Sequence, residues 1–369
     1  MINSSNFLRF LKSKKINFFT GVPDSLLKDF LKELSIFSKS DQNNIIASNE
    51  GSAVSIGIGH YLATKNIPCV YMQNSGLGNA INPLSSLAHQ DVYSIPLLLL
   101  IGWRGSPSIK DEPQHLVKGK ITLKLLNLLK IRYAVLNDKT KNFSKISKLI
   151  SYSKKNSKPI ALVIEKNTFK KNKQNSSKKI NSKNPFRYQI IETLLKNIKK
   201  NTKIISTTGY TSREVNQIRR DNNIKRGEDF YLVGGMGHAS SVSLGVSLKT
   251  KKKVICLDGD GSLIMHLGSL TTTGYFKNKN LIHIMFNNKS HESVGGQKVF
   301  SDNINYKNLV NSLGYKNYFL IQNKKEFKKK IFHFLNLKGP TFINIKIKPG
   351  SLKNLKRPTN LKKIKNNFH

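Results

Sequence analysis

Short apolar runs of strand length alternate with segments of helical apolar spacing along almost the whole chain, and this alternation limits the possible folds more than any other feature. Runs that are apolar at successive positions indicate strands buried on both faces. Strand and helix in turn indicate a parallel sheet with helices on both sides. The sequence therefore predicts an α/β protein with doubly wound parallel sheets.

The alternation occurs twice, with a break between the two halves. We expect first-half strands at 17–20, 45–47, 67–73, 95–102, 133–136 and 160–164, with helices at 7–11, 26–34, 54–62, 122–129 and 143–150. Second-half strands are expected at 203–207, 230–233, 254–257, 281–286, 315–319 and 341–347. Two similar domains follow, at 1–165 and 186–350, joined by a Lys/Asn/Ser-rich linker at 166–185. A basic tail at 351–369 is expected to fray.

The charge balance raises the question of a nucleic-acid partner. The chain has 63 Lys and Arg against 20 Asp and Glu, a net charge of +43. Lysine accompanies Asn and Ile throughout and forms no single basic stripe, so a solvated surface is favoured over a nucleic-acid site. A basic nucleic-acid-binding protein on an inactive scaffold stays the alternative from another functional class.

Cysteine and apolar content indicate the compartment. Cys69 and Cys256 both lie in apolar runs, as buried thiols do in a reducing environment. The longest apolar run, 95–101, is too short to cross a bilayer. The first residues lack a signal peptide's apolar core. We expect a cytoplasmic protein with no membrane partner.

Two polar motifs follow predicted strands of the second half. Asp260 comes after one strand and Asn288 after the next, 28 residues later. Carboxylate and amide oxygens suit Mg²⁺, and Gly259 and Gly261 would let the backbone approach a diphosphate. Ser262 would begin a helix whose N–H groups favour an anion. Asp-Gly pairs alone more often mark turns, so the second motif gives the pattern its specificity.

A carboxylate also follows a strand in the first half, at Glu50 in Ser48-Asn49-Glu50-Gly51. Helix capping by Ser48 or Asn49, with Glu50 complementing the helix dipole, explains the segment without a ligand. A buried functional carboxylate is the other interpretation.

GDGS followed by NN resembles the Mg²⁺–thiamine diphosphate motif of thiamine-dependent decarboxylases. The resemblance implies that Asp260, the Asn288 side chain and the Ser290 carbonyl hold Mg²⁺. It also implies that Met236, between glycines, bends the cofactor, whose amino group donates to the Gly234 carbonyl.

The same resemblance gives Glu50 a role. In this family a glutamate contacts the cofactor's aminopyrimidine and activates it, and it reaches a cofactor held by the other subunit. The resemblance therefore implies a homodimer or higher oligomer with active sites at the subunit interface.

Within this family the chain resembles the phosphonopyruvate decarboxylases, which also lack a middle domain. The resemblance lies in TGVPDSLL, NSGLGNAINPL, GWRG with DEPQH, and HESVGGQ, at 20–27, 74–84, 102–115 and 291–297. It implies decarboxylation of 3-phosphonopyruvate in phosphonate biosynthesis. Asp24 and His115 are the expected proton-handling residues, and Arg104, Ser25 and His291 would bind the small anionic 2-oxo acid. Sulfopyruvate is the alternative substrate.

Overall fold

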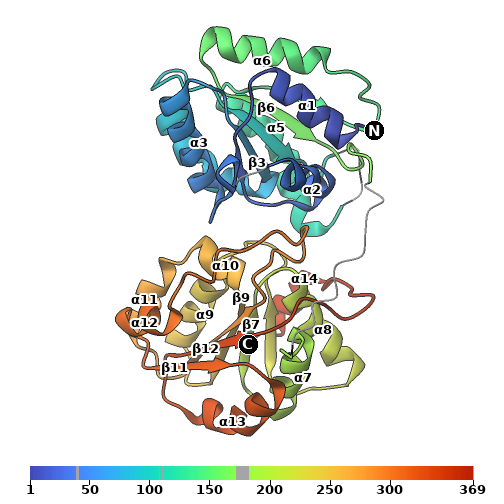
Figure 1. Ribbon diagram of the computed structural model, residues 1–369. Helices are drawn as coiled ribbons and strands as arrows, with labels where there is room; N and C mark the ends of the chain where they lie inside the picture. Colours follow the sequence, from blue (N-terminus) through green and yellow to red (C-terminus); the bar gives the residue numbers. More distant parts are fainter. Residues whose placement is uncertain (39–40, 108, 110, 172–182, 369) are drawn as a thin grey trace. The chain divides into compact units, whose positions relative to one another are not determined.

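The computed structural model describes residues 1–38, 41–107, 109, 111–171 and 183–368, which form two compact units (Figure 1). Each unit is an α/β domain around a parallel sheet that the structure resolves as six-stranded over these residues. The predicted fold class is confirmed. In the part of the chain so described, no helix is long and apolar enough to cross a membrane.

Strands and helices of the first unit alternate as expected. Its strands are β1 (Phe19–Gly21), β2 (Asn44–Ile46), β3 (Cys69–Gln73), β4 (Leu98–Gly102), β5 (Arg132–Leu136) and β6 (Ile160–Ile164). Its helices are α1 (Ser4–Ser13), α2 (Lys28–Phe37), α3 (Glu50–Thr64), α4 (Leu77–Pro83), α5 (Pro113–Leu128) and α6 (Ser144–Asn156), with short turns η1 (Ser25–Leu27), η2 (Asp41–Asn43), η3 (Asn74–Gly76) and η4 (Leu84–Ala88).

The second unit repeats this plan. Its strands are β7 (Lys203–Ser206), β8 (Glu228–Tyr231), β9 (Val254–Gly259), β10 (Leu281–Asn287), β11 (Asn317–Ile321) and β12 (Thr341–Lys346). Its helices are α7 (Arg187–Asn197), α8 (Tyr210–Asp221), α9 (Ala239–Leu248), α10 (Asp260–Met265), α11 (Ser269–Phe276), α12 (Tyr306–Ser312), α13 (Lys324–Asn336) and α14 (Leu361–Asn366).

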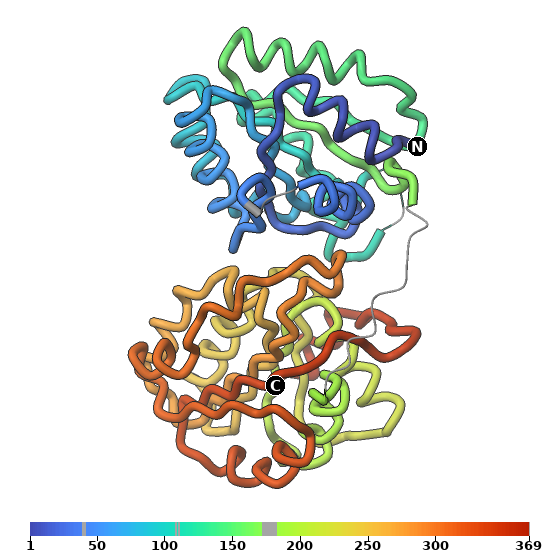
Figure 2. Tube along the Cα trace, in the orientation of Figure 1, coloured from blue at the N-terminus to red at the C-terminus, as the bar shows by residue number. Residues whose placement is uncertain are grey.

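Both sheets have the same strand order, and the chain trace within each unit can be followed in Figure 2. The first sheet runs β2-β1-β3-β4-β6-β5, and the second runs β8-β7-β9-β10-β12-β11. Numbered from its own first strand, each is 2-1-3-4-6-5. The connections after strands 1 and 3 therefore leave in opposite directions, which opens a crevice at the carboxyl ends of these neighbouring strands.

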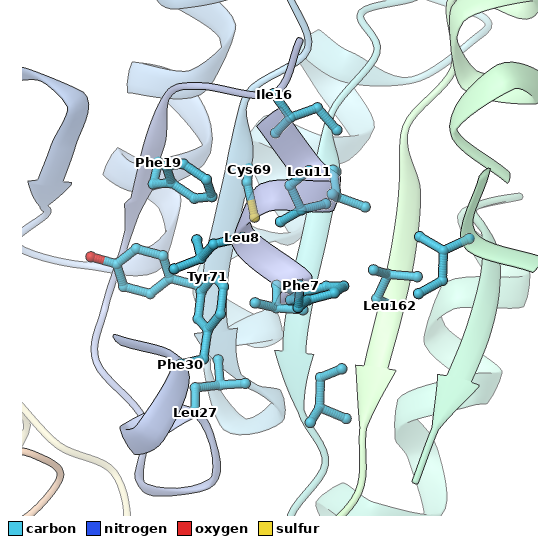
Figure 3. Close-up of a cluster of buried hydrophobic side chains, with 14 of the residues drawn as sticks. Phe7, Leu8, Leu11, Ile16, Phe19, Leu27, Phe30, Cys69, Tyr71 and Leu162 are labelled. Carbon is cyan, nitrogen blue, oxygen red and sulfur yellow. The ribbon is translucent and has the colours of Figure 1, made fainter. Parts of the chain in front are cut away.

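The first sheet is buried on both faces because successive residues of its strands point to opposite sides. Cys69 and Tyr71 face a cluster with α1, α2 and α6, whereas Val70 and Met72 face a cluster with α3, α4 and α5. Figure 3 shows the first cluster, in which Phe7 of α1 and Phe30 of α2 lie against the strands. Their rings meet edge to face at 5.7 Å.

The second sheet is covered in the same way. Helices α7, α8 and α13 pack on one face through residues such as Ile191, Val215 and Phe334. Helices α9, α10, α11 and α12 contribute to the clusters on the other. In both units the helices cover the faces of the sheet, and the loops lie at the carboxyl ends of the strands.

Three segments differ from expectation. Phe169, inside the predicted linker, is buried and packs against Phe7 and Phe30, so the first unit extends further than the composition indicates; residues 172–182 lie outside the described residues. The tail expected to fray instead forms α14, and Phe368 packs against Phe230. Helix α4 has no counterpart among the predicted helices.

Candidate active site

Asp24 lies in the first unit's crevice, just after β1. Its side chain is completely buried and accepts hydrogen bonds from Gln73 Nε2 (2.6 Å) and the backbone N–H of Leu26 (2.9 Å). Burial raises its pKa above the ordinary value, although these bonds and the Arg104 charge oppose the rise. A Cβ at Gly102 would lie 2.2 Å from Asp24 Oδ2, so the end of β4 needs a glycine there. Burial therefore favours the protonated form of this carboxyl more than it would for an exposed aspartate.

Glu50 is the first residue of α3 and is buried. The helix cap is Asn49, whose side chain accepts from Ser52 N–H (2.9 Å), so capping does not need Glu50. Asn79 Nδ2 donates to Glu50 Oε2 (2.7 Å). A Cβ at Gly76 would lie 2.3 Å from Oε1, so the turn after β3 makes room for this carboxyl. Glu50 is thus held in one orientation by residues outside its own helix.

Arg104 follows β4 and forms a fork on Asp111. Its Nε donates to Asp111 Oδ2 (2.7 Å), Nη2 donates to Oδ1 (2.5 Å), and Nη1 donates to Ser25 Oγ (3.2 Å). Burial opposes ionisation of Asp111, but the bonds from Arg104 and from backbone N–H groups outweigh it and hold its pKa below the usual range. Among the described residues these contacts use three of the five guanidinium N–H groups, and two remain for an anion.

His115 is in the first turn of α5, and its backbone packs against Gly105, the residue after Arg104. Gly105 has a φ of +70°, and a Cβ there would lie 2.1 Å from the His115 carbonyl oxygen. The structure thus places Asp24, Ser25 and Arg104 together and brings the His115 backbone beside them. A small pocket is lined by Leu26, Trp103, Arg104, Gly105, Ser106, Ile109, Asp111 and Lys166.

In the second unit, Asp260 and the loop after β10 come together. Asp260 Oδ1 accepts from Gly261 N–H (2.9 Å), and Oδ2 accepts from Lys289 N–H (2.7 Å). Asn288 Oδ1 accepts from Ser290 N–H (3.0 Å). Asp260 and the loop that carries Asn288 and Ser290 therefore lie at one edge of the sheet, because β9 and β10 are parallel neighbours.

These donors fit a divalent cation. Asp260 is 3% exposed, and burial raises its pKa to about 6, although hydrogen bonds from Lys289, Gly261 and Ser301 oppose the rise. A buried carboxylate stabilised by hydrogen bonds alone gains from a cation. A Cβ at Gly259 would meet no described atom within 4 Å, so the backbone that precedes Asp260 is open on that side. Mg²⁺ suits this set because it takes few protein ligands and shares the rest with water and phosphate.

The glycine turn after β8 is tied to α10 through Ser262. Ser262 Oγ accepts from Gly237 N–H (3.1 Å) and bonds Thr207 Oγ1 (2.8 Å) at the crevice between β7 and β9. Gly234 is exposed and Met236 is half-buried. The turn that carries these two residues is therefore anchored beside residues 259–262, which are predicted to border the diphosphate.

His291 packs on the same loop. A Cβ at Gly261 would lie 2.8 Å from His291 Cε1, so this glycine admits the ring. Burial lowers the pKa of His291 to about 4. The ring is neutral at pH 7 and can act as a hydrogen-bond donor or acceptor but not as a cation.

Sequence reasoning gave no role to several side chains that orient these residues. Gln73 holds Asp24, Asn79 holds Glu50, Asp111 holds Arg104, and Glu292 accepts from Asn288 Nδ2 (3.0 Å). All four lie in or beside the motif segments after strands. That position was the available signal, but the partner of each depends on contacts that spacing does not reveal.

Family models match both units. The model described as thiamine pyrophosphate enzyme, N-terminal TPP binding domain, matches residues 4–124, and the corresponding C-terminal TPP binding domain matches 207–345. A phosphonopyruvate decarboxylase of Streptomyces viridochromogenes is 31% identical, over 97% of this chain and 91% of the relative. The chain belongs to the thiamine pyrophosphate enzymes.

Two further relatives of this thiamine pyrophosphate enzyme are also decarboxylases or subunits of one. A phosphonopyruvate decarboxylase of Streptomyces hygroscopicus is 31% identical over 97% of this chain and 90% of its own length. A sulfopyruvate decarboxylase subunit beta of Methanocaldococcus jannaschii is 35% identical over 41% of this chain and 78% of its own length. The predicted family, cofactor class and enzyme class, a decarboxylase, are confirmed.

Proposed function

We propose that this enzyme uses thiamine diphosphate (thiamine pyrophosphate) and Mg²⁺ to decarboxylate 3-phosphonopyruvate to phosphonoacetaldehyde and CO₂, a step of phosphonate biosynthesis. The observation that carries the substrate is the match to phosphonopyruvate decarboxylases along 97% of the chain. The reaction is non-oxidative, so no electron acceptor is required.

The metal and the diphosphate of the cofactor would be held by residues of the second unit. Asp260, Asn288 and the Ser290 carbonyl would hold Mg²⁺, and Gly259, Gly261 and Ser262 would border the diphosphate. The Gly234–Met236 turn would contact the rest of the cofactor. When bound, thiamine diphosphate supplies the carbon nucleophile and the electron sink that decarboxylation needs.

We assign proton transfer to two buried carboxyl groups, those of Glu50 and Asp24. Glu50, held by Asn79, would exchange a proton with the cofactor's pyrimidine ring. Asp24, whose pKa is raised by burial, can carry the proton that the product carbon requires, with His115 as a second proton-handling group.

Substrate charge would be met by Arg104. Its fork on Asp111 fixes the guanidinium plane, and the two N–H groups that have no partner among the described residues can bind phosphonate oxygens. Ser25, which Arg104 also contacts, and the neutral His291 ring would supply further hydrogen bonds.

We test the substrate by offering phosphonopyruvate, sulfopyruvate and pyruvate in parallel with thiamine diphosphate and Mg²⁺. A large kcat/KM preference for phosphonopyruvate is expected. Preference for sulfopyruvate, which the Methanocaldococcus jannaschii relative makes the second candidate, would keep the reaction and change the substrate. If the protein binds no cofactor but binds DNA with a steep salt dependence, the proposal that it is an enzyme is refuted.

We also propose a homodimer or larger assembly with each active site completed by a second copy. Support comes from the subunit name of the sulfopyruvate decarboxylase and from exposed apolar residues of α5, with Val117 68% and Leu128 78% exposed. Co-expression of Glu50→Gln and Asp260→Asn chains tests it. Mixed dimers with shared sites would recover about a quarter of wild-type activity, because half the dimers are mixed and each has one intact site. No recovery from mixed dimers would place both residues in one copy.

A further inference from the structure

A largely buried ionic network in the second unit ends at the proposed metal loop. Arg187, the first residue of α7, is 5% exposed, and Glu214 of α8 is fully buried. Arg187 Nε donates to Glu214 Oε2 (2.8 Å), and Nη1 donates to Glu292 Oε2 (3.5 Å). Arg187 thus joins a carboxylate of α8 to one in the loop after β10.

Two backbone N–H groups at the point where the tail begins complete this network. The backbone N–H of Gly350 donates to Glu292 Oε1, and that of Leu352 donates to Glu214 Oε1 (3.3 Å). Each oxygen of the Glu292 carboxylate therefore has a partner from a different part of the unit. The side chain cannot rotate without breaking a bond to Arg187 or to the tail.

The fixed carboxylate selects one orientation of the Asn288 amide. Asn288 Nδ2 donates to Glu292 Oε2 at 3.0 Å. An ionised carboxylate only accepts hydrogen bonds, so the flipped amide would set two oxygens against each other. The amide oxygen consequently faces away from Glu292, on the side where it accepts from Ser290 N–H.

We propose that Glu292 is a positioning residue that presents the Asn288 oxygen to Mg²⁺, and that Arg187 holds Glu292 in place. This inference rests on the metal site of the proposed function. A purely structural role explains less, because a largely buried network of one guanidinium and two carboxylates is a weak way to gain stability. Its position against a metal ligand gives the network a use beyond stability.

The test measures Mg²⁺ affinity of the full-length protein by calorimetry in saturating thiamine diphosphate. Glu292→Gln is expected to weaken Mg²⁺ binding by about 10- to 100-fold, the usual cost of losing a group that orients a metal ligand. Asp302→Asn is the matched control, because Asp302 pairs with Lys289 of the same loop at 2.6 Å but is half-exposed. Its Mg²⁺ affinity should stay within about twofold of wild type.

A double variant separates orientation from structure. In Asn288→Asp both side-chain atoms are oxygens, so there is no amide to orient, and the new carboxylate is repelled by Glu292. Adding Glu292→Gln to Asn288→Asp should therefore strengthen Mg²⁺ binding, the opposite of its effect in wild type. A structural role predicts weakening in both backgrounds.

The outcomes keep the two levels of inference apart. If wild-type protein shows no Mg²⁺-dependent cofactor binding, the proposed function is overturned. If wild type binds and Glu292→Gln stays within twofold of it, or weakens binding in both backgrounds, only the positioning role is overturned. Should Glu292→Gln fail to fold, Arg187→Lys, which keeps the charge but loses the fork, must weaken Mg²⁺ binding or the proposal fails.

Discussion

Replacing Asp260 with asparagine in the metal-free protein should change the pH dependence of stability in a direction set by burial. Asp260 is 3% exposed, and burial raises its pKa from 3.8 to about 6. The folded state therefore binds the proton more tightly than the unfolded state. The contribution of Asp260 to the free energy of unfolding falls as pH rises through this interval and is least favourable above pH 6.

The size of the effect follows from the two pKa values. The gap between 3.8 and about 6, at about 1.4 kcal/mol per pH unit, makes the ionised carboxylate cost about 3 kcal/mol at high pH. Roughly half of this cost develops between pH 5 and pH 8. Asparagine does not titrate, so the variant lacks this component.

Denaturant unfolding in the presence of a chelator, at pH 5 and pH 8, measures the effect. Relative to Asp260→Asn, wild type should lose about 1.4 kcal/mol between these pH values, while groups common to both proteins cancel. Comparing slopes removes the hydrogen bond that the amide loses to Gly261 or Lys289. Parallel pH dependences would refute the reasoning. Adding Mg²⁺ and thiamine diphosphate should stabilise wild type and not the variant, since ligand binding stabilises the state that binds it.

Three further substitutions test the first unit. Glu50→Gln should leave cofactor affinity within a few-fold by calorimetry but lower kcat by about 10²- to 10⁴-fold, because a proton-exchanging group is lost; wild-type turnover would return Glu50 to a helix-terminus role. Gly76→Ala should lower kcat in the same way, since its Cβ would lie 2.3 Å from the Glu50 carboxyl, whereas Gly78→Ala, with nothing within 4 Å, is the control and should match wild type in steady-state assays. Arg104→Lys keeps the charge but loses the fork on Asp111, so KM for phosphonopyruvate should rise by about 10-fold or more with a smaller change in kcat; an unchanged KM would remove Arg104 from the substrate site.

The strands were predictable because both sheets are parallel and buried on both faces. Segments such as 160–164 are then apolar at every position, and they read as strands without tertiary information. Helix α4 was not predictable in this way, because it is short, contains two glycine or proline positions, and owes its burial to α3. Its role in placing Asn79 against Glu50 came from packing.

The site was predictable where a motif follows a strand directly. Asp260 and Asn288 lie together because their strands are neighbours in the sheet. Residues that orient them depend on chain segments far away in sequence, as Glu292 depends on Arg187. The tail shows the limit of composition. Its Lys and Asn content indicates fraying, yet where it begins the N–H groups of Gly350 and Leu352 donate to Glu292 and to the buried Glu214.

Because of these contacts, the backbone amides of Gly350 and Leu352 can report on whether the ionic network is intact. The amide hydrogens of Gly350 and Leu352 can exchange with solvent only when their bonds to Glu292 and Glu214 open. Their exchange rates therefore measure the local opening free energy of the network. Hydrogen–deuterium exchange at two positions near the end of the chain thus records the state of a loop 58 residues earlier, without substrate or turnover.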